Sequence, residues 1–190
     1  MVSAILLAAG KGSRFARAES KVLFKLRGKP VIYYSLSVLN KHPQIDEIII
    51  VASFDNLKEI KRIVRRYKIN KASKVILGGR ERKDSVACGL GAIDPRAGFV
   101  LVQDGARPFI TTKMVSSSIA AAKRRGGAVV GVPVKYTVQE VWGHRVVKTL
   151  ERERLWEIQT PQVFRREVIL KAYKNKSGRV TDDSMLAERI

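Results

Sequence analysis

The sequence is short of cysteine, of acidic residues and of long apolar runs, and each shortage excludes a class of protein. Cys88 is the only cysteine, so the chain cannot form an internal disulfide, which fits a reducing cytosol. No apolar run approaches the ~20 residues that a membrane-spanning helix needs. The N-terminus also lacks the basic segment that opens a signal peptide. We therefore expect a cytoplasmic protein that does not enter a membrane.

Acidic residues are scarce relative to basic ones: 17 Asp and Glu against 37 Lys and Arg give a formal net charge of +20. Such an excess attracts anions and accelerates association with them at low salt. Over residues 57–67, apolar side chains recur at helical spacing and basic ones fill the other side, which favours a solvated helix face over one that binds RNA or a membrane. The aromatic content of 7%, mostly at core spacing, also argues against a nucleic-acid surface.

Short apolar runs alternate with longer amphipathic segments, which is typical of a parallel sheet with helices on both faces. The 190 residues predict a single domain, residues 1–190. Apolar runs without alternation, such as residues 48–51, indicate strands buried on both faces. The expected strands are residues 2–8, 47–52, 74–77, 99–103 and 128–134, and the expected helices lie near residues 30–40, 56–67, 82–93 and 113–125.

Two regions depart from this alternation. Residues 137–150 predict a β-hairpin that turns at residues 142–145, within a projecting arm of about residues 135–155. A lone hairpin is marginal in water, so we expect this one to pack on another surface, such as a second subunit. Near the other end, Thr181, Asp182 and Asp183 predict a helix start, after which the chain stops without a capping signal.

Two glycine-rich turns follow strands. After the first strand, Gly10 and Gly12 let the backbone approach a bound group, its amides can cradle an anion, and Arg14 adds charge. Lys21 follows closely enough for a curled loop to bring it to the same phosphates. The second turn, residues 78–86, places amide groups and the Ser85 hydroxyl where they could hold a base or ribose. A tight strand-to-helix turn explains either motif nearly as well.

A third motif follows the expected strand at residues 99–103. Ligands of open α/β sheets bind at the carboxyl ends of the strands, where Asp104 and Arg107 lie. Asp104 could hold Mg²⁺ through oxygen, and Arg107 could bind a phosphate with two parallel hydrogen bonds. The alternative is an Asp–Arg pair that stabilises a turn.

Together these motifs resemble the 2-C-methyl-D-erythritol 4-phosphate cytidylyltransferase family. The residues that carry the resemblance are, in order, Ala8, Ala9, Gly10, Gly12, Arg14, Lys21, Gly78, Gly79, Arg82, Ser85, Val86, Asp104, Arg107, Pro108, Thr160, Pro161, Gln162, Thr181, Asp182 and Asp183. The resemblance covers nearly the whole chain. It implies an α/β, Rossmann-like nucleotidyltransferase fold that uses CTP and Mg²⁺ and releases pyrophosphate in non-mevalonate isoprenoid biosynthesis.

The resemblance also implies roles for some of these residues and for two residues of the arm. The catalytic pair that stabilises the transition state is Arg14 and Lys21, and the CTP pocket is Ala8, Ala9, Gly10, Gly12, Gly78, Gly79 and Ser85. Asp104, Arg107 and Thr160 line the side that binds the acceptor. Thr137 and Arg152 match residues that the arm offers to the neighbouring subunit's site, which implies a homodimer.

The implied chemistry suits the residues present. An acceptor phosphate with its second pKa near ~6 is largely a dianion at neutral pH, so it can attack CTP without a general base. The only histidines, His42 and His144, are expected in a loop and at a hairpin tip. The chain departs from the family pattern at Arg80, where an acidic residue is common. It also ends before the further strand, with its substrate-binding lysine, and the final helix that the family usually has.

Three other functions remain open. Ribitol 5-phosphate cytidylyltransferase shares the fold and the CTP loop, and its acceptor differs by one carbon and a methyl branch. A sugar-1-phosphate nucleotidyltransferase would share the first glycine loop but lack the residue 78–85 and 160–162 motifs. A basic nucleic-acid-binding protein on a nucleotidyltransferase fold is a candidate from another class, permitted by the charge of +20.

Overall fold

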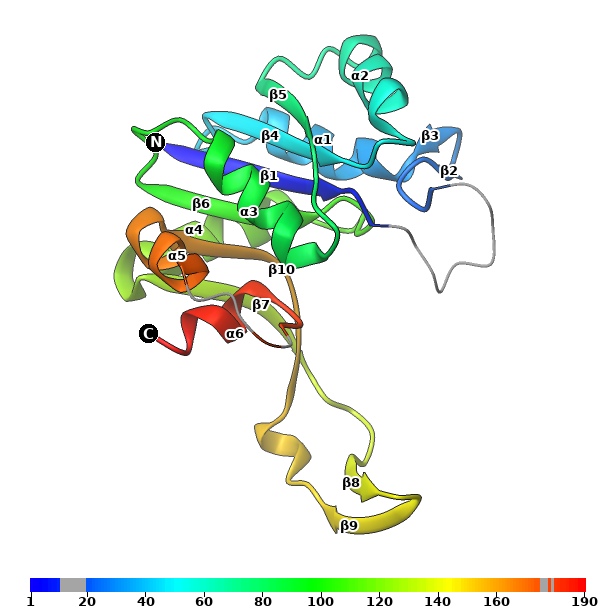
Figure 1. Cartoon of the computed structure of the whole chain (residues 1–190), viewed down its shortest axis with the longest axis vertical. Helices are drawn as coiled ribbons and strands as arrows, with labels where there is room; N and C mark the ends of the chain where they lie inside the picture. The colour runs from blue at the N-terminus through cyan, green and yellow to red at the C-terminus, as the bar shows by residue number, and fades with distance from the viewer. Residues whose placement is uncertain (11–19, 175–177, 179) are drawn as a thin grey trace.

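The computed structural model describes residues 1–10, 20–174, 178 and 180–190. One six-stranded sheet, in the order β5-β4-β1-β6-β10-β7, organises these residues (Figure 1). Its strands are β1 (Val2–Ala8), β4 (Glu47–Ala52), β5 (Ala72–Leu77), β6 (Phe99–Asp104), β7 (Gly127–Pro133) and β10 (Trp156–Arg165). The first four in the sheet order are parallel, and β10 runs antiparallel to both β6 and β7. The mostly parallel sheet is therefore confirmed.

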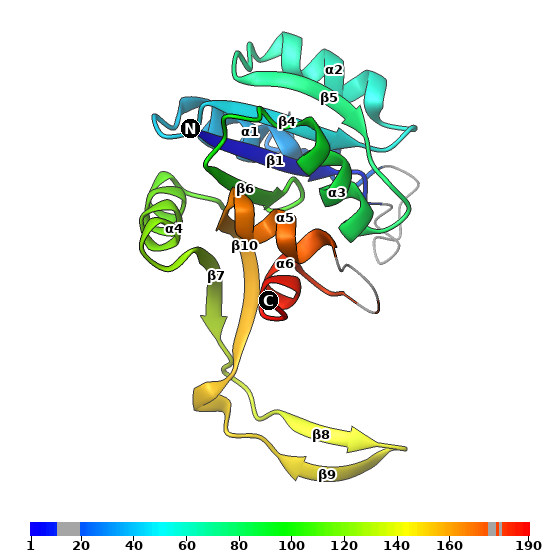
Figure 2. The same ribbon diagram turned by 60° about the vertical axis from the view of Figure 1, so that its left-hand side comes forward.

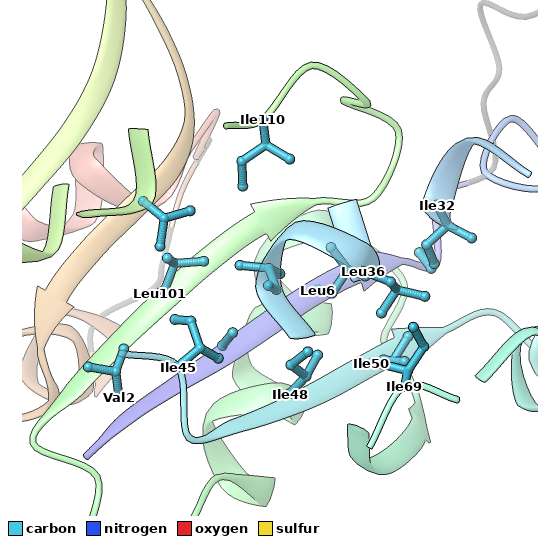
Figure 3. Close-up of a cluster of buried hydrophobic side chains, with 14 of the residues drawn as sticks. Val2, Leu6, Ile32, Leu36, Ile45, Ile48, Ile50, Ile69, Leu101 and Ile110 are labelled. Carbon is cyan, nitrogen blue, oxygen red and sulfur yellow. The ribbon is translucent and has the colours of Figure 1, made fainter. Parts of the chain in front are cut away.

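Helices cover both faces of the sheet, as the alternation of segments predicts. They are α1 (Val31–Lys41), α2 (Leu57–Arg66), α3 (Arg82–Ala92), α4 (Thr112–Arg125), α5 (Arg166–Lys174) and α6 (Asp183–Ala187). One buried cluster joins the sheet to α1, α2 and α4 (Figure 3), and a second joins it to α3, α5 and α6. Leu6 lies in the first cluster and Ile5 in the second, so β1 is buried on both faces, as its unbroken apolar run requires. No helix of the described residues has the length and the apolar character needed to cross a bilayer.

The five expected strands are confirmed with small shifts at their ends, but β10 and α5 were missed. The segment that forms β10 has exposed residues at its start and Pro161 inside it. A proline inside a segment argues against a central strand, because proline cannot donate a hydrogen bond to the ladder. The ladder to β7 shifts register between Gln159 and Gln162, so the pairing passes around the proline, which has no N–H to donate. Pairing with β6 on one side and β7 on the other therefore makes this segment a strand, against its weak local signal.

The expected hairpin arm is present. β8 (Gln139–Trp142) and β9 (Arg145–Thr149) pair antiparallel, and Gly143 and His144 in the turn have positive φ angles of 51° and 64°. Figures 1 and 2 both show the arm projecting away from the sheet, preceded by β7 and followed by η1 (Arg152–Arg154) and β10. Its apolar side chains face solvent in the chain taken alone, with Trp142 83% exposed.

The predicted C-terminal helix start is also confirmed. Asp182 is the N-cap of α6, and its carboxylate accepts a hydrogen bond of 3.1 Å from the backbone N–H of Met185. The cap places the next residue, Asp183, at the buried side of the helix, with 1% of its surface exposed.

His42 is buried at the end of α1 and stays neutral. The N–H of Gln44 donates to its Nδ1 at 3.2 Å, so the ring proton is on Nε2, which lies 2.9 Å from the Ser116 hydroxyl. Burial, helped by the charge of nearby Lys71, lowers the pKa of His42 below its usual value and outweighs the backbone hydrogen bond with Thr112, which acts in the opposite direction. Protonation would place an additional positive charge in a site already crowded with donors.

We expect His42 to make the folded state less stable below neutral pH. As pH falls through ~6.5, the unfolded chain gains a proton on this histidine that the folded chain resists, so stability decreases by up to ~1.4 kcal/mol per pH unit for one proton. Urea unfolding of the wild type and of His42→Gln at pH 7.5 and 5.5 checks this. The free-energy advantage of the wild type should shrink at the lower pH, and a constant difference would contradict the assignment.

Candidate active site

Asn56 fixes the two ends of the first glycine-rich turn. This buried side chain donates to the carbonyl of Ala8, the last residue of β1, at 2.8 Å and to the Ser20 hydroxyl at 3.2 Å. Its own oxygen accepts from the N–H of Ser53 at 2.9 Å. Lys21, which follows Ser20 and is exposed, is thereby held near the end of β1. The predicted residues Gly12 and Arg14 lie outside the described residues.

The second turn packs directly on the first. A Cβ added at Gly78 would lie 2.6 Å from the Ser85 oxygen and 2.8 Å from the Cβ of Ala9, so only glycine allows this approach. Ser85 itself is buried, and its hydroxyl donates to the carbonyl of Glu81 at 3.1 Å, within the first turn of α3. The structure thus brings Ala9, Gly78 and Ser85 together, three of the residues expected to hold CTP.

The glycine at this junction can be tested by substitution. Gly78→Ala is expected to destabilise the protein by about 1–3 kcal/mol through overpacking against Ser85 and Ala9, and to weaken CTP binding. Gly91→Ala is the matched control, because a Cβ at this exposed helix position meets nothing within 4 Å and should stabilise α3 by about 0.5–1 kcal/mol. Denaturant unfolding and CTP titration measure both effects. Equal stability of the two variants would contradict the packing described.

The third turn follows β6, directly beside the first. Leu7 pairs with Asp104 across the β1–β6 ladder, and Gly105 donates its N–H to the Leu7 carbonyl at 2.8 Å. Asp104 donates its own N–H to the Thr160 hydroxyl at 3.2 Å, and its carboxylate accepts from Arg107 at 3.1 Å. The three residues expected to line the acceptor side, Asp104, Arg107 and Thr160, therefore form one cluster.

A charged network behind this cluster was missed in the sequence. Arg82, the first residue of α3, lies 3.3 Å from one oxygen of Asp104 and 3.0 Å from one oxygen of Asp183. The hydroxyl of Tyr173 donates to the other oxygen of Asp183. Arg82 and Asp183 belonged to family motifs, but only the fold makes them neighbours.

Burial and charge act in opposite directions on this network. Burial disfavours the charged form of Arg82, but the carboxylates of Asp183 and Asp104 outweigh it and raise the pKa of the guanidinium above its usual value. Burial, together with the negative charge of Asp183, raises the pKa of Tyr173. The arginine is therefore always charged and the tyrosine always a donor.

The two arm residues lie apart from the cluster within one chain. Thr137 precedes β8, and Arg152 begins the short helix η1, where its guanidinium donates to the carbonyl of Lys135 at 3.2 Å. Figures 1 and 2 place the arm on the far side of β7 and β10 from the end of β1.

No described group of three or more His, Cys, Asp or Glu side chains could hold a metal ion. Both oxygens of Asp104 already accept from arginines, Oδ1 from Arg82 and Oδ2 from Arg107. A divalent cation would therefore need most of its ligands from a bound substrate, as Mg²⁺ commonly does with nucleotide phosphates.

The turns after β1, β5 and β6 meet at the carboxyl edge of the parallel strands, with Lys21 on one side and the Asp104–Arg107–Thr160 cluster on the other, which is the arrangement of a nucleotidyltransferase. The match to known proteins specifies it further: the model of the 2-C-methyl-D-erythritol 4-phosphate cytidylyltransferase family matches residues 2–190, and the chain belongs to this family. It is thus a cytidylyltransferase of isoprenoid biosynthesis.

Individual proteins that the chain resembles belong to the same family. The chain is 43% identical to the 2-C-methyl-D-erythritol 4-phosphate cytidylyltransferase of Alkaliphilus metalliredigens, over 98% of this chain and 80% of the relative. It is 42% identical to that of Dehalococcoides mccartyi, over 100% and 83%. The crystal structure of 4-diphosphocytidyl-2C-methyl-D-erythritol synthase from Anaerococcus prevotii superposes with a TM-score of 0.86 at 30% identity, covering 99% of this chain and 83% of that one.

Proposed function

We propose that this site transfers CMP from CTP to the phosphate of 2-C-methyl-D-erythritol 4-phosphate and releases pyrophosphate. The observation that carries the proposal is the direct contact between the glycine turns and the acceptor cluster. Gly78 meets Ala9, and Gly105 bonds to Leu7, so a nucleotide held at the first two turns lies next to a phosphate held at the third. That proximity lowers the entropic cost of the reaction, and the attacking phosphate dianion needs no catalytic base.

The reaction needs alignment and charge neutralisation. An oxygen of the acceptor's phosphate dianion attacks the α-phosphorus of CTP, a new P–O bond forms, and the bond to the β-phosphate breaks as pyrophosphate leaves with the electron pair. Lys21, together with Arg14, neutralises the non-bridging oxygens of the α-phosphate as charge develops there. Arg107 binds the acceptor's phosphate, and Asp104 accepts hydrogen bonds from its hydroxyl groups.

Mg²⁺ fits this scheme as a partner of the triphosphate, because it keeps water ligands and takes phosphate oxygens readily. When bound, it would neutralise phosphate charge and hold the phosphates in one conformation. Asp104 is the carboxylate that the sequence motifs offer as a metal ligand. Both of its oxygens accept from arginines, so it would have to release one of them to bind the cation.

We also propose a homodimer in which each arm completes the other subunit's site. Thr137 precedes β8 and Arg152 begins η1, so both belong to the arm, which projects away from the sheet in Figures 1 and 2. The arm exposes apolar side chains, with Tyr136 84% and Trp142 83% exposed. Burying them against a second copy would satisfy the hairpin's need for a packing partner.

The experiment that tests the acceptor is direct. The protein is incubated with CTP and Mg²⁺ and with either 2-C-methyl-D-erythritol 4-phosphate or ribitol 5-phosphate, and pyrophosphate is measured. We expect release with the branched tetritol phosphate, at a kcat/KM at least ~10-fold above that with ribitol 5-phosphate, since one carbon and a methyl branch are worth about 1–3 kcal/mol of discrimination. The reverse preference would overturn the proposed acceptor.

A further inference from the structure

The carboxylate of Asp104 is held from two sides by arginines that differ in what else they bind. Its Oδ1 accepts from Nε of Arg82 at 3.3 Å, and its Oδ2 accepts from Nε of Arg107 at 3.1 Å. Arg107 comes from the same turn and is the more exposed, with 42% of its side chain accessible against 30% for Arg82. The carboxylate itself is 27% exposed, so a ligand can reach it.

Arg82 also pairs with a second carboxylate, that of Asp183. Its Nη2 lies 3.0 Å from Asp183, whose side chain is fully buried. The other oxygen of Asp183 accepts from the buried hydroxyl of Tyr173 in α5, so the carboxylate is fixed by two elements of the C-terminal half. A series of contacts therefore runs from Tyr173 through Asp183 and Arg82 to Asp104, and it connects α5 and α6 to the acceptor cluster.

The charges of this cluster balance before any substrate arrives. Two carboxylates, Asp104 and Asp183, face two guanidiniums, Arg82 and Arg107. An arriving phosphate dianion needs a cation. Arg82 cannot supply it, because turning away would leave the carboxylate of Asp183 buried and unpaired, which is strongly unfavourable. Arg107 pairs with Asp104, whose carboxylate is partly exposed and is also held by Arg82. Arg107 can therefore turn away without leaving a buried carboxylate unpaired.

We propose that Arg82, held in place by Asp183 and Tyr173, is a positioning residue that keeps the Asp104 carboxylate oriented toward the acceptor's hydroxyl groups while Arg107 turns to the acceptor's phosphate. Arginine is required here because its planar fork addresses two carboxylates at once, whereas a lysine ammonium binds as a single point charge. The inference rests on the proposed acceptor site at Asp104.

The test is a steady-state comparison of Arg82→Lys with the wild type, varying CTP and the acceptor separately. We expect the KM for 2-C-methyl-D-erythritol 4-phosphate to rise by about tenfold, with kcat and the KM for CTP each changed by less than ~3-fold, because uniform binding of the acceptor is weakened. Arg96→Lys is the matched control: the same exchange in an exposed ion pair, 2.7 Å from Asp94, should leave all three constants unchanged.

A second variant keeps the test decisive if Arg82→Lys does not fold. Tyr173→Phe removes one donor to Asp183 without changing any charge, and it should raise the acceptor's KM in the same way but less. A purely structural role would instead lower the melting temperature and the active fraction of the enzyme. The apparent kcat would then fall, while the KM values for both substrates would stay at their wild-type values. That outcome for either folded variant overturns the proposal.

Asp104→Asn separates this inference from the proposed function. If Asp104→Asn raises the acceptor's KM and Arg82→Lys does not, the positioning role is wrong and the acceptor site stands. If Asp104→Asn leaves the acceptor's KM unchanged, the acceptor site itself is wrong, and the role of Arg82 is overturned with it.

Discussion

Replacing Lys21 with alanine is expected to lower kcat by at least ~100-fold, the loss typical of removing one preorganised donor to a developing oxyanion. Lys21 is exposed and held near the end of β1 through the Asn56 link. In the proposed mechanism, its ammonium contacts the triphosphate bound at the first turn. Pyrophosphate release at saturating CTP and acceptor measures the effect on kcat.

Lys25→Ala provides the control for charge. Lys25 is an exposed lysine in β2 (Lys25–Leu26), which pairs with β3 (Lys29–Pro30), and its removal changes the net charge as much as the loss of Lys21 does. Its kcat should stay within about twofold of the wild type, because the loss of a single exposed charge that makes none of the proposed contacts has a small effect. Wild-type turnover by Lys21→Ala would remove this residue from the mechanism.

Two impaired variants are expected to regain activity when they are mixed. In the proposed dimer, a site takes Lys21 from one chain and Arg152 from the arm of the other. Arg152→Ala should lose ~10-fold or more in kcat/KM, because it removes one charge-assisted contact to a phosphate. After subunit exchange with Lys21→Ala, half of the dimers are heterodimers with one intact site each, so about one quarter of wild-type activity should return.

The control mixes Lys21→Ala with Asp104→Ala. Both residues belong to the same chain's site, because β1 and β6 are neighbouring strands and Leu7 pairs with Asp104. Every heterodimer then has one defect in each site, and no activity should return. If the Lys21 and Arg152 variants also fail to complement, although their subunits exchange, then Arg152 does not act in the partner's site.

The local sequence was enough to predict much of the fold. Buried parallel strands such as β1 and β4 are continuous apolar runs, and the Gly143–His144 turn marks the hairpin. The strand β10 was missed because its exposed start and its proline weaken the local signal, while its place in the sheet depends on pairing with β6 and β7. Such pairing over long sequence separations is not visible in a short window.

The candidate site, like the fold, was predicted only in part from the sequence. Ala9, Gly78 and Ser85, and likewise Asp104, Arg107 and Thr160, were each predicted from motifs, and the structure brings each set together. The positioning role of the side chains around them was not predicted, although Arg82 and Asp183 belong to the motifs that carry the family resemblance. Asn56 was predicted only as the first residue of the helix at 56–67. Tyr173 and Asp183 lie far from Arg82 in the sequence, so only the fold, which brings Asp183 to both Tyr173 and Arg82, makes them partners.

The central claim is that the first glycine turn presents the triphosphate of CTP to Lys21 beside the acceptor cluster. A crystal structure of the protein with CTP and Mg²⁺ tests it most directly. We expect the Lys21 Nζ within hydrogen-bonding distance, ~3 Å, of an α-phosphate oxygen, and the acceptor cluster open on the side opposite the leaving pyrophosphate. A triphosphate bound elsewhere, with the lysine directed away from it, would contradict the account.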